Sequence, residues 1–315
     1  MIGFILRRLV QSVLVLLGVT LVVFILEHLV PGSLARAILG PHASRRAVAT
    51  FRRENGLEHP LVVQYFVFLG HLAEGNLGRS YRLNVSVDSL IGSELPNDLI
   101  LVGGALVLAV AIAVPLGVAQ AVRKSSVFDH VTTGVSLVLY SVPSYCLALL
   151  LVAGLSVGVH LFPSEAPQAT GAGAVLSDPR ALVLPVATLT LVNIALFSRY
   201  MRASAIDALG EEYVRVARAK GASRRQVVNR HLLRNSAGAV VTLVGLSLPA
   251  VLTSGLIVEY LFNFPGLGLS YFTAAVNSDY PVMLGITVLV ALATVVGNLL
   301  ADVAYAVLDP RIRYD

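Results

Sequence analysis

Few residues of this 315-residue chain have the types and spacing that catalysis requires. Neither of its two lysines, Lys124 and Lys220, belongs to the G-x-x-x-x-G-K-[ST] pattern of a phosphate-binding loop. The patterns H-E-x-x-H and G-x-S-x-G are also absent, since the stretch GLSLP at residues 245–249 departs from the second one at its last position. We therefore predict neither a catalytic site nor a cofactor in this chain.

Histidine and cysteine usage gives no pattern of metal ligands either. The seven histidines are scattered, and His59 and His71, which both lie between the first and second apolar runs, are better explained as surface residues than as ligands. The single cysteine, Cys146, lies in an apolar run and can form neither an intrachain disulfide nor a thiolate cluster. We predict no metal site.

Four polar residues stand inside or at the ends of apolar runs: Asn193, Glu259, Asn298 and Asp302. A charge at the centre of a membrane costs about 2.5–3.5 kcal/mol on insertion scales, so such residues are candidates for a transport pathway or a partner contact. For Glu259 and Asp302, near the ends of their runs, a salt bridge or a helix cap is an equally good explanation.

Pro143 interrupts another apolar run, within the sequence SVPS at residues 141–144. Because proline removes a backbone donor, we predict a kink there, either beside a pathway or as a matter of packing alone.

The elements that carry these residues are membrane helices. The chain is 56% hydrophobic and only 13% charged, against about 25% charged in soluble domains. Spanning a bilayer takes about 20 apolar residues, and six runs qualify: Leu9–Leu29, Leu99–Val122, Val131–Val159, Ala181–Tyr200, Ala237–Glu259 and Val282–Leu308. The runs lack the alternation of a membrane barrel, so we predict an all-α integral membrane protein with six transmembrane helices.

Short basic flanks predict the orientation of these helices. Arginine or lysine lies before the first run and after the second, fourth and sixth, which places both termini in the cytoplasm. The predicted divisions are residues 1–30, the tail and first helix; 31–98, an extracytoplasmic cap; and 99–315, a core of five helices with a cytoplasmic loop at 204–236. Within the cap we expect helices over Ser44–Asn55 and Leu61–Leu72. Cleavage of the first run as a secretory signal is the lesser alternative, because its apolar part is long for a signal.

One highly charged stretch, Glu211–Ser236, which we call the charged loop, joins the fourth and fifth runs. Gly221 is suited to end a first short helix, and Ser223 with Gln226 fits the capping box of a second one. Apolar residues four apart, basic residues and small residues together suggest a helix pair that inserts into a groove on another protein. A basic segment lying on anionic lipid and a solvated linker are the alternatives. Binding to nucleic acid is not expected, because both ends are tethered to membrane spans.

The charged loop also resembles a known sequence. Residues 213–221, YVRVARAKG, followed by Val227, His231 and LRN at 233–235, are similar to the cytoplasmic "EAA" loop of binding-protein-dependent ABC importer permeases. The similarity continues in EYLFNFPGLG at 259–268, DYP at 279–281 and DPRIR at 309–313, and at the front in FILRR at 4–8 and GNLG at 75–78. The closest branch is the "B" permease of dipeptide, oligopeptide and nickel importers.

This resemblance implies a type I importer permease fold in the bacterial cytoplasmic membrane and the transport of di- or oligopeptides. It implies as partners a homologous C-type permease, two ATP-binding subunits that hold the ATP and Mg²⁺, and an extracytoplasmic substrate-binding protein. In that family the loop docks on the ATPase, and the matching positions here are Glu211, Glu212, Tyr213, Arg215, Ala217, Arg218, Lys220, Gly221, Ser223, Val227, His231 and Arg234.

Some positions depart from the family pattern, and all lie on the outer side. They are Ser33, Asn76 and Ser278, together with Asp98, where threonine is usual. The substrate therefore stays open between peptides, nickel and another small solute. An ion-coupled secondary transporter or channel, and a lipid-binding scaffold, are the alternatives from other classes.

Overall fold

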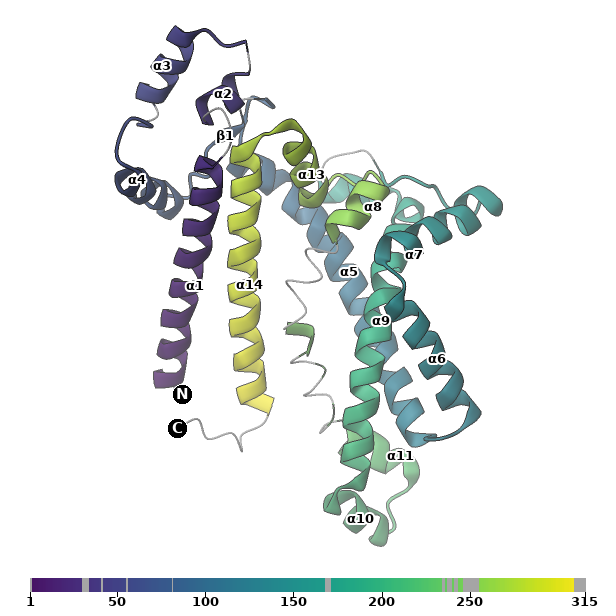
Figure 1. Cartoon of the computed structure of the whole chain (residues 1–315). Coiled ribbons are helices and arrows are strands. Elements are labelled where there is room, and N and C mark those ends of the chain that lie inside the picture. Colours follow the sequence, from purple (N-terminus) through teal and green to yellow (C-terminus); the bar gives the residue numbers. More distant parts are fainter. Residues whose placement is uncertain are drawn as a thin grey trace.

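The computed structural model describes the chain except for residues 1, 30–33, 41, 55, 81, 168–170, 234–235, 237–239, 241–242, 246–254 and 309–315. Four long helices run along the molecule: α1 (Ile2–His28), α5 (Val87–Val122), α9 (Pro179–Gly210) and α14 (Tyr280–Leu308). The start of α1, the end of α14 and the charged loop all lie at one end, which we call the loop end, and the opposite end is the cap end (Figure 1).

These four helices match four of the predicted spans. Helix α14 begins two residues earlier than predicted, whereas α5 begins at Val87, inside the segment predicted as a cap, and continues through Pro96. Among the described residues, three helices are long and apolar enough to cross a membrane, namely α5, α9 and residues 280–300 of α14. The apolar part of α1, Val10–Leu26, is shorter than these three and is not counted with them.

The predicted third span is not a single straight helix. It consists of α6 (Val127–Ser141), α7 (Ser144–Leu151) and a π-helical segment, η1 (Val152–Gly158). The predicted break at Pro143 is confirmed, because Pro143 is the N-cap residue of α7. The change of direction there is 105°, which is far more than a kink, and if the pair is counted as one bent span it is a fourth candidate.

The cap segment is mostly helical. It contains α2 (Leu34–Leu39), α3 (Arg45–Glu54) and α4 (Leu61–Ala73), and the last two confirm the helices predicted there. A short antiparallel hairpin, β1 (Arg79–Ser80) and β2 (Val85–Ser86), then leads into α5, so the fold is not purely helical. The Ser80 hydroxyl donates to Oδ2 of Asp279 at 2.5 Å and ties this hairpin to the start of α14.

The remaining described elements connect the long helices. They are α8 (Ala172–Ser177), α10 (Glu212–Ala219), α11 (Arg224–Gln226), the π-helical η2 (Val227–Leu232), a helix over residues 255–261, and α13 (Leu267–Asn277). Most of the predicted fifth span, Ala237–Glu259, lies outside the described residues.

Helices α5 and α9 form the centre of the molecule. At Gly117 the two backbones come so close that an added Cβ would lie 2.7 Å from both Met201 Cβ and Ser198 O. Small residues allow this approach between membrane helices. The tight contact positions the charged loop, because α9 leads directly into α10.

Candidate functional site

The charged loop folds as the sequence predicts. Gly221 has φ +83°, a conformation that L-residues with a side chain rarely adopt, and its amide donates to the carbonyl oxygen of Arg218 at 3.0 Å. The Ser223 hydroxyl accepts from the Gln226 amide at 3.3 Å, while Gln226 Oε1 accepts from the Ser223 amide at 2.8 Å. This reciprocal capping box starts α11, so a helix–turn–helix shape is confirmed.

Part of the loop is packed against its own chain. Val214, Ala217, Val227 and Leu232 are buried, and Leu232 belongs to an apolar cluster with Val118 of α5 and Met201 of α9. Arg224 Nη2 donates to the carbonyl oxygen of Val122, the last residue of α5, at 3.0 Å. Two residues assigned to ATPase contact by resemblance, Ala217 and Val227, are therefore buried within the chain, and Leu232 and Arg224 hold the loop against α5 and α9.

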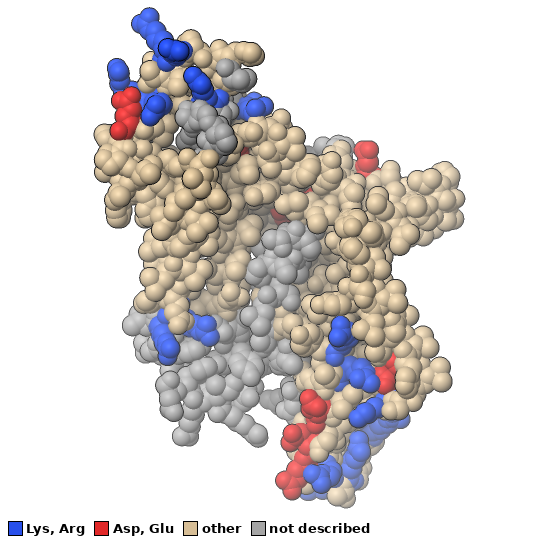
Figure 2. All heavy atoms as spheres, viewed as in Figure 1, with Lys and Arg blue, Asp and Glu red and all other residues tan. Residues whose placement is uncertain are grey.

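The outward surface of the loop is charged. Glu211, Glu212, Arg215, Arg218, Lys220, Gly221 and Ser223 are exposed, and Tyr213 is half-buried. Figure 2 shows acidic and basic side chains gathered side by side at the loop end. Glu212 stands in the first turn of α10 and Arg218 in its last, where each complements the helix dipole. Arg234 and the side chain of His231 lie outside the described residues.

A small cavity of about 430 Å³ opens behind the loop. Its walls are Val122 of α5, Leu209 of α9 and Val227 of η2, with Arg218 and Arg224 also lining it. The loop therefore packs against the ends of two long helices with a cavity left between them.

An ion pair that the sequence analysis did not identify holds α6 to α9 near the loop end. Arg202 donates to Asp129 through Nε at 2.7 Å and through Nη2 at 2.8 Å. Asp129 is buried and also accepts from the Ser125 amide at 3.0 Å. The sequence shows an acidic residue, Asp129, just after the basic flank of the second run, and a basic residue, Arg202, just after the fourth run. It does not show that these two residues, 73 positions apart, form a pair.

A second polar cluster surrounds the start of α13 near the cap end. Glu259 Oε2 accepts from the amides of Gly268 at 2.7 Å and Leu269 at 3.2 Å. Asp98 Oδ1 accepts from the Leu267 amide at 3.1 Å. Because the first amides of a helix have no partners within it, these two carboxylates satisfy the start of α13. Of the two explanations left open for Glu259, the contacts favour the cap.

Two further residues of α5, absent from the candidate set, complete this cluster. Ser270 donates to Glu94 Oε1 at 2.7 Å, and the Asn97 side-chain amide donates to the Pro265 carbonyl oxygen at 2.7 Å. An added Cβ at Gly266 would overlap oxygens of both Asp98 and Glu259, so only glycine fits between them. The sequence signal was the PGLG stretch at 265–268 together with the unusual acid at position 98.

The other pathway candidates lie in separate environments. Asn193 is buried, but its side-chain amide donates to the Leu189 carbonyl oxygen of its own helix at 2.7 Å. Asn298 is exposed on α14. The side chain of Asp302 lies outside the described residues. The contacts of these residues do not define a pathway.

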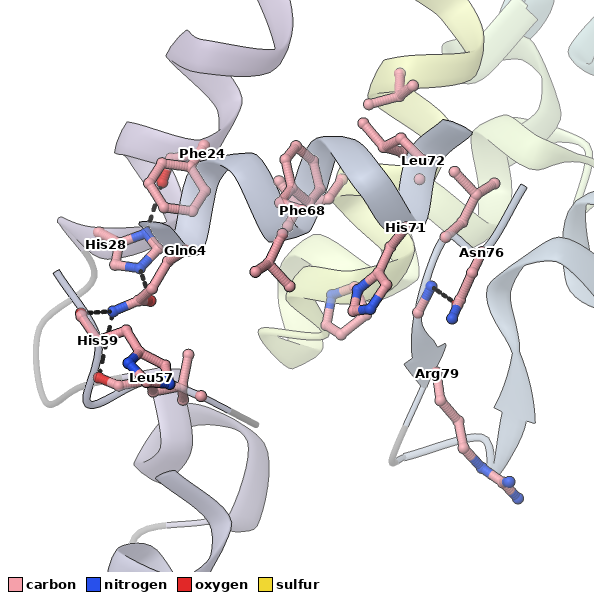
Figure 3. Close-up of a pocket in the computed structure, with 18 of the residues that line it drawn as sticks. Phe24, His28, Leu57, His59, Gln64, Phe68, His71, Leu72, Asn76 and Arg79 are labelled. Carbon is pink, nitrogen blue, oxygen red and sulfur yellow. Dashed lines mark hydrogen bonds between the residues drawn. The ribbon is translucent and has the colours of Figure 1, made fainter. Parts of the chain in front are cut away.

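The cap end contains a larger cavity of about 720 Å³, bounded by α1, α3, α4, the hairpin and α14. Figure 3 shows His28 and Gln64 together at one end, His71 and Asn76 at the other, and Phe68 between them. Within the part of the chain that is described, His, Cys, Asp and Glu side chains do not gather in groups of three that could hold a metal.

Comparison with known proteins matches nearly the whole chain to two family descriptions. Residues 113–314 match "Binding-protein-dependent transport system inner membrane component", and residues 1–101 match the N-terminal part of such components. The chain belongs to this family. It is therefore a membrane permease component of a transport system, and its long apolar helices are membrane helices.

Several family members align with the chain end to end. The oligopeptide transport system permease protein AppB of Bacillus subtilis (strain 168) is 35% identical, with 100% of both chains covered. The glutathione transport system permease protein GsiC of Salmonella choleraesuis (strain SC-B67) is 34% identical, also over 100% of both. The dipeptide transport system permease protein DppB of Escherichia coli (strain K12) is 32% identical, over 100% of this chain and 99% of its own.

Proposed function

We propose that this chain is the membrane-spanning subunit of an ATP-driven importer that carries di- or oligopeptides across the bacterial cytoplasmic membrane. The support for the substrate class is that three full-length relatives carry names of oligopeptide, dipeptide and glutathione permeases. In this proposal the chain spans the membrane six times with both termini in the cytoplasm, and it pairs with a homologous C-type permease. An extracytoplasmic binding protein delivers the peptide to the cap end.

The charged loop carries the coupling part of this proposal. Its inner face is held to α5 and α9 through Leu232 and Arg224, while its outer face presents Glu211, Arg215 and Lys220. A unit fixed on one side and free on the other can transmit the movement of a bound partner to the helices behind it. Two ATP-binding subunits, which hold the ATP and Mg²⁺, are the partners proposed for the free side.

Uptake by reconstituted vesicles tests this function. The chain is incorporated with its partner permease and ATPases, and accumulation of a labelled dipeptide is followed with and without ATP and the binding protein. We expect uptake to need both. The Gly221→Val variant should lose uptake while the subunits still co-purify, whereas Gly210→Val, at a position with open space and no positive φ, should retain it.

The alternatives predict different results in the same assay. Uptake by the chain without any ATPase would identify an ion-coupled carrier instead. Uptake of Ni²⁺ that an excess of dipeptide does not inhibit would assign the importer to nickel. Unchanged ATP-driven uptake by Gly221→Val would contradict the proposed role of the charged loop.

A further inference from the structure

Helix α4 has an apolar surface that nothing in the described chain covers. Its sequence, LVVQYFVFLGHLA, contains no Asp, Glu, Lys or Arg, and at 13 residues it is too short to span a bilayer. Leu61, Val62 and Phe66 are 56%, 67% and 65% exposed. Exposure of this apolar face to water would cost free energy, and burial against lipid or protein removes that cost.

The opposite face of α4 is bonded to α1. The Tyr65 hydroxyl donates to the Leu17 carbonyl oxygen at 3.0 Å and lies 3.0 Å from the Thr20 hydroxyl oxygen. Gln64 Oε1 lies 3.1 Å from His28 Nε2, and the Phe24 ring contacts the Tyr65 ring with centroids 5.4 Å apart. The polar groups of α4 thus point toward α1 and the cavity, as does the Phe68 ring, whereas Val62 and Phe66, one helical turn apart, point away.

These bonds set the depth of α4. Leu17 precedes His28, the last residue of α1, by eleven positions, which corresponds to about 16 Å along a helix. Helix α4 therefore lies beside the final turns of α1 and not beyond its end, as Figure 1 also shows. Across those turns Val22, Ile25 and Leu26 of α1 are themselves 56%, 46% and 59% exposed. A bilayer that covers these side chains must also cover α4.

The charge distribution agrees with this depth. On the face in Figure 2 a wide uncharged band separates the basic side chains near the start of α1 from the charged side chains, mostly Lys and Arg, that gather at the cap end, and α4 lies at the cap side of this band. Helix α3 carries exposed arginines there, at positions 45, 46, 52 and 53. Apolar helices that lie in the plane of the membrane occupy the boundary between head groups and acyl chains, with basic groups on the water side.

We propose that α4 is a membrane-embedded helix whose outward face, with Val62 and Phe66, contacts the acyl chains of the bilayer leaflet on the cap side. The surface continues the lipid-facing side of α1. Part of the segment expected to be an extracytoplasmic cap is then within the membrane, and α4 forms a wall between lipid and the cavity of about 720 Å³. This inference does not depend on what is transported.

Photo-crosslinking in cells that contain the whole transport system tests the contact. A benzophenone amino acid is placed at position 66, at position 68 on the inward side of the same helix, and at position 26 of α1 as the lipid-facing reference. Cells are grown with radioactive phosphate to label phospholipids and are then irradiated. We expect labelled lipid on the chain with the probe at 66 and at 26, and a crosslink within the chain at 68.

Two results would overturn the proposal. One is a crosslink from position 66 to another protein, which would make this face a subunit interface. The other is lipid labelling at 26 without labelling at 66, which would place α4 in water.

Because the benzophenone is larger than phenylalanine, a second measurement uses a smaller change. The chain contains no tryptophan, so Phe66→Trp creates a single reporter in vesicles of the purified full-length chain. Its fluorescence should be quenched by phospholipids brominated near the head-group end of the acyl chain, as should that of Leu26→Trp. The proposal would also be overturned if the emission of Phe66→Trp were red-shifted and unquenched while that of Leu26→Trp was quenched.

Discussion

Arg202 of α9 and Asp129 of α6 form a two-bond ion pair, with Nε 2.7 Å from Oδ1 and Nη2 2.8 Å from Oδ2. Paired, parallel bonds of this kind are stronger and more directional than a single contact. The pair fixes the first half of the bent helix to the central helix pair, next to the charged loop.

Removing either partner should destabilise the chain more than removing both. We expect Asp129→Asn and Arg202→Gln to interact in a double-mutant cycle by about 0.5–3 kcal/mol, because the single changes each leave a charge without its partner. Thermal unfolding in detergent, followed by circular dichroism, measures this. Strictly additive effects of the two substitutions would show that the pair contributes nothing beyond its separate residues.

Position 221 allows a test of backbone conformation apart from side-chain size. A residue with a Cβ pays about 1–2 kcal/mol in the left-handed region, but asparagine enters it more readily than others and β-branched residues enter it least. Within this chain an added Cβ at Gly221 meets open space. We therefore expect Gly221→Asn to keep more ATP-driven uptake than Gly221→Val. Equal loss in both variants would instead indicate that a partner surface excludes any side chain there.

The acceptor at Glu259 should matter more than its charge. Glu259→Gln keeps an oxygen for the amides of Gly268 and Leu269, whereas Glu259→Leu leaves both without it, at about 1–3 kcal/mol for the buried amide of Gly268. We expect Glu259→Gln to unfold close to the wild-type temperature and Glu259→Leu well below it. If the two variants unfold alike, the contacts to the start of α13 do not stabilise the fold.

The close approach of α5 and α9 predicts a difference between glycines of one helix. Gly117→Ala would insert a Cβ 2.7 Å from Met201 Cβ and Ser198 O, whereas Gly103→Ala adds it to open space. Overpacking of this kind costs about 1–3 kcal/mol, so Gly117→Ala should lower the unfolding temperature and the yield of folded protein. Gly103→Ala is the matched control, and similar unfolding temperatures for both would contradict the packing described.

Features encoded within a few residues could be predicted from the sequence. Gly221 and Ser223 mark a turn because backbone chirality and capping are local, and Pro143 marks a break for the same reason. The 105° angle at that break could not be predicted, since it depends on how the two halves pack. The start of α5 was placed too late because the amphipathic turns before Asp98 do not read as an apolar run.

Contacts between distant residues were beyond the sequence. Asp98 bonds to Leu267, which is 169 positions away, and Tyr65 bonds to Leu17, which is 48 positions away. Nothing in the periodicity of either segment selects these partners. For the same reason the burial of Ala217 and Val227 could not be predicted: a small residue or an apolar stripe has the same appearance in the sequence whether it faces another protein or its own chain.

Helix α5 touches both polar sites described above. Its last residue, Val122, accepts a bond from Arg224 of the charged loop, and Asp98 on the same helix holds the Leu267 amide at the start of α13. About 36 Å of continuous helix separates the two points. One helix therefore carries both contacts, with Pro115 between them, so a rotation of α5 at the loop end would also displace Asp98 from the first amides of α13.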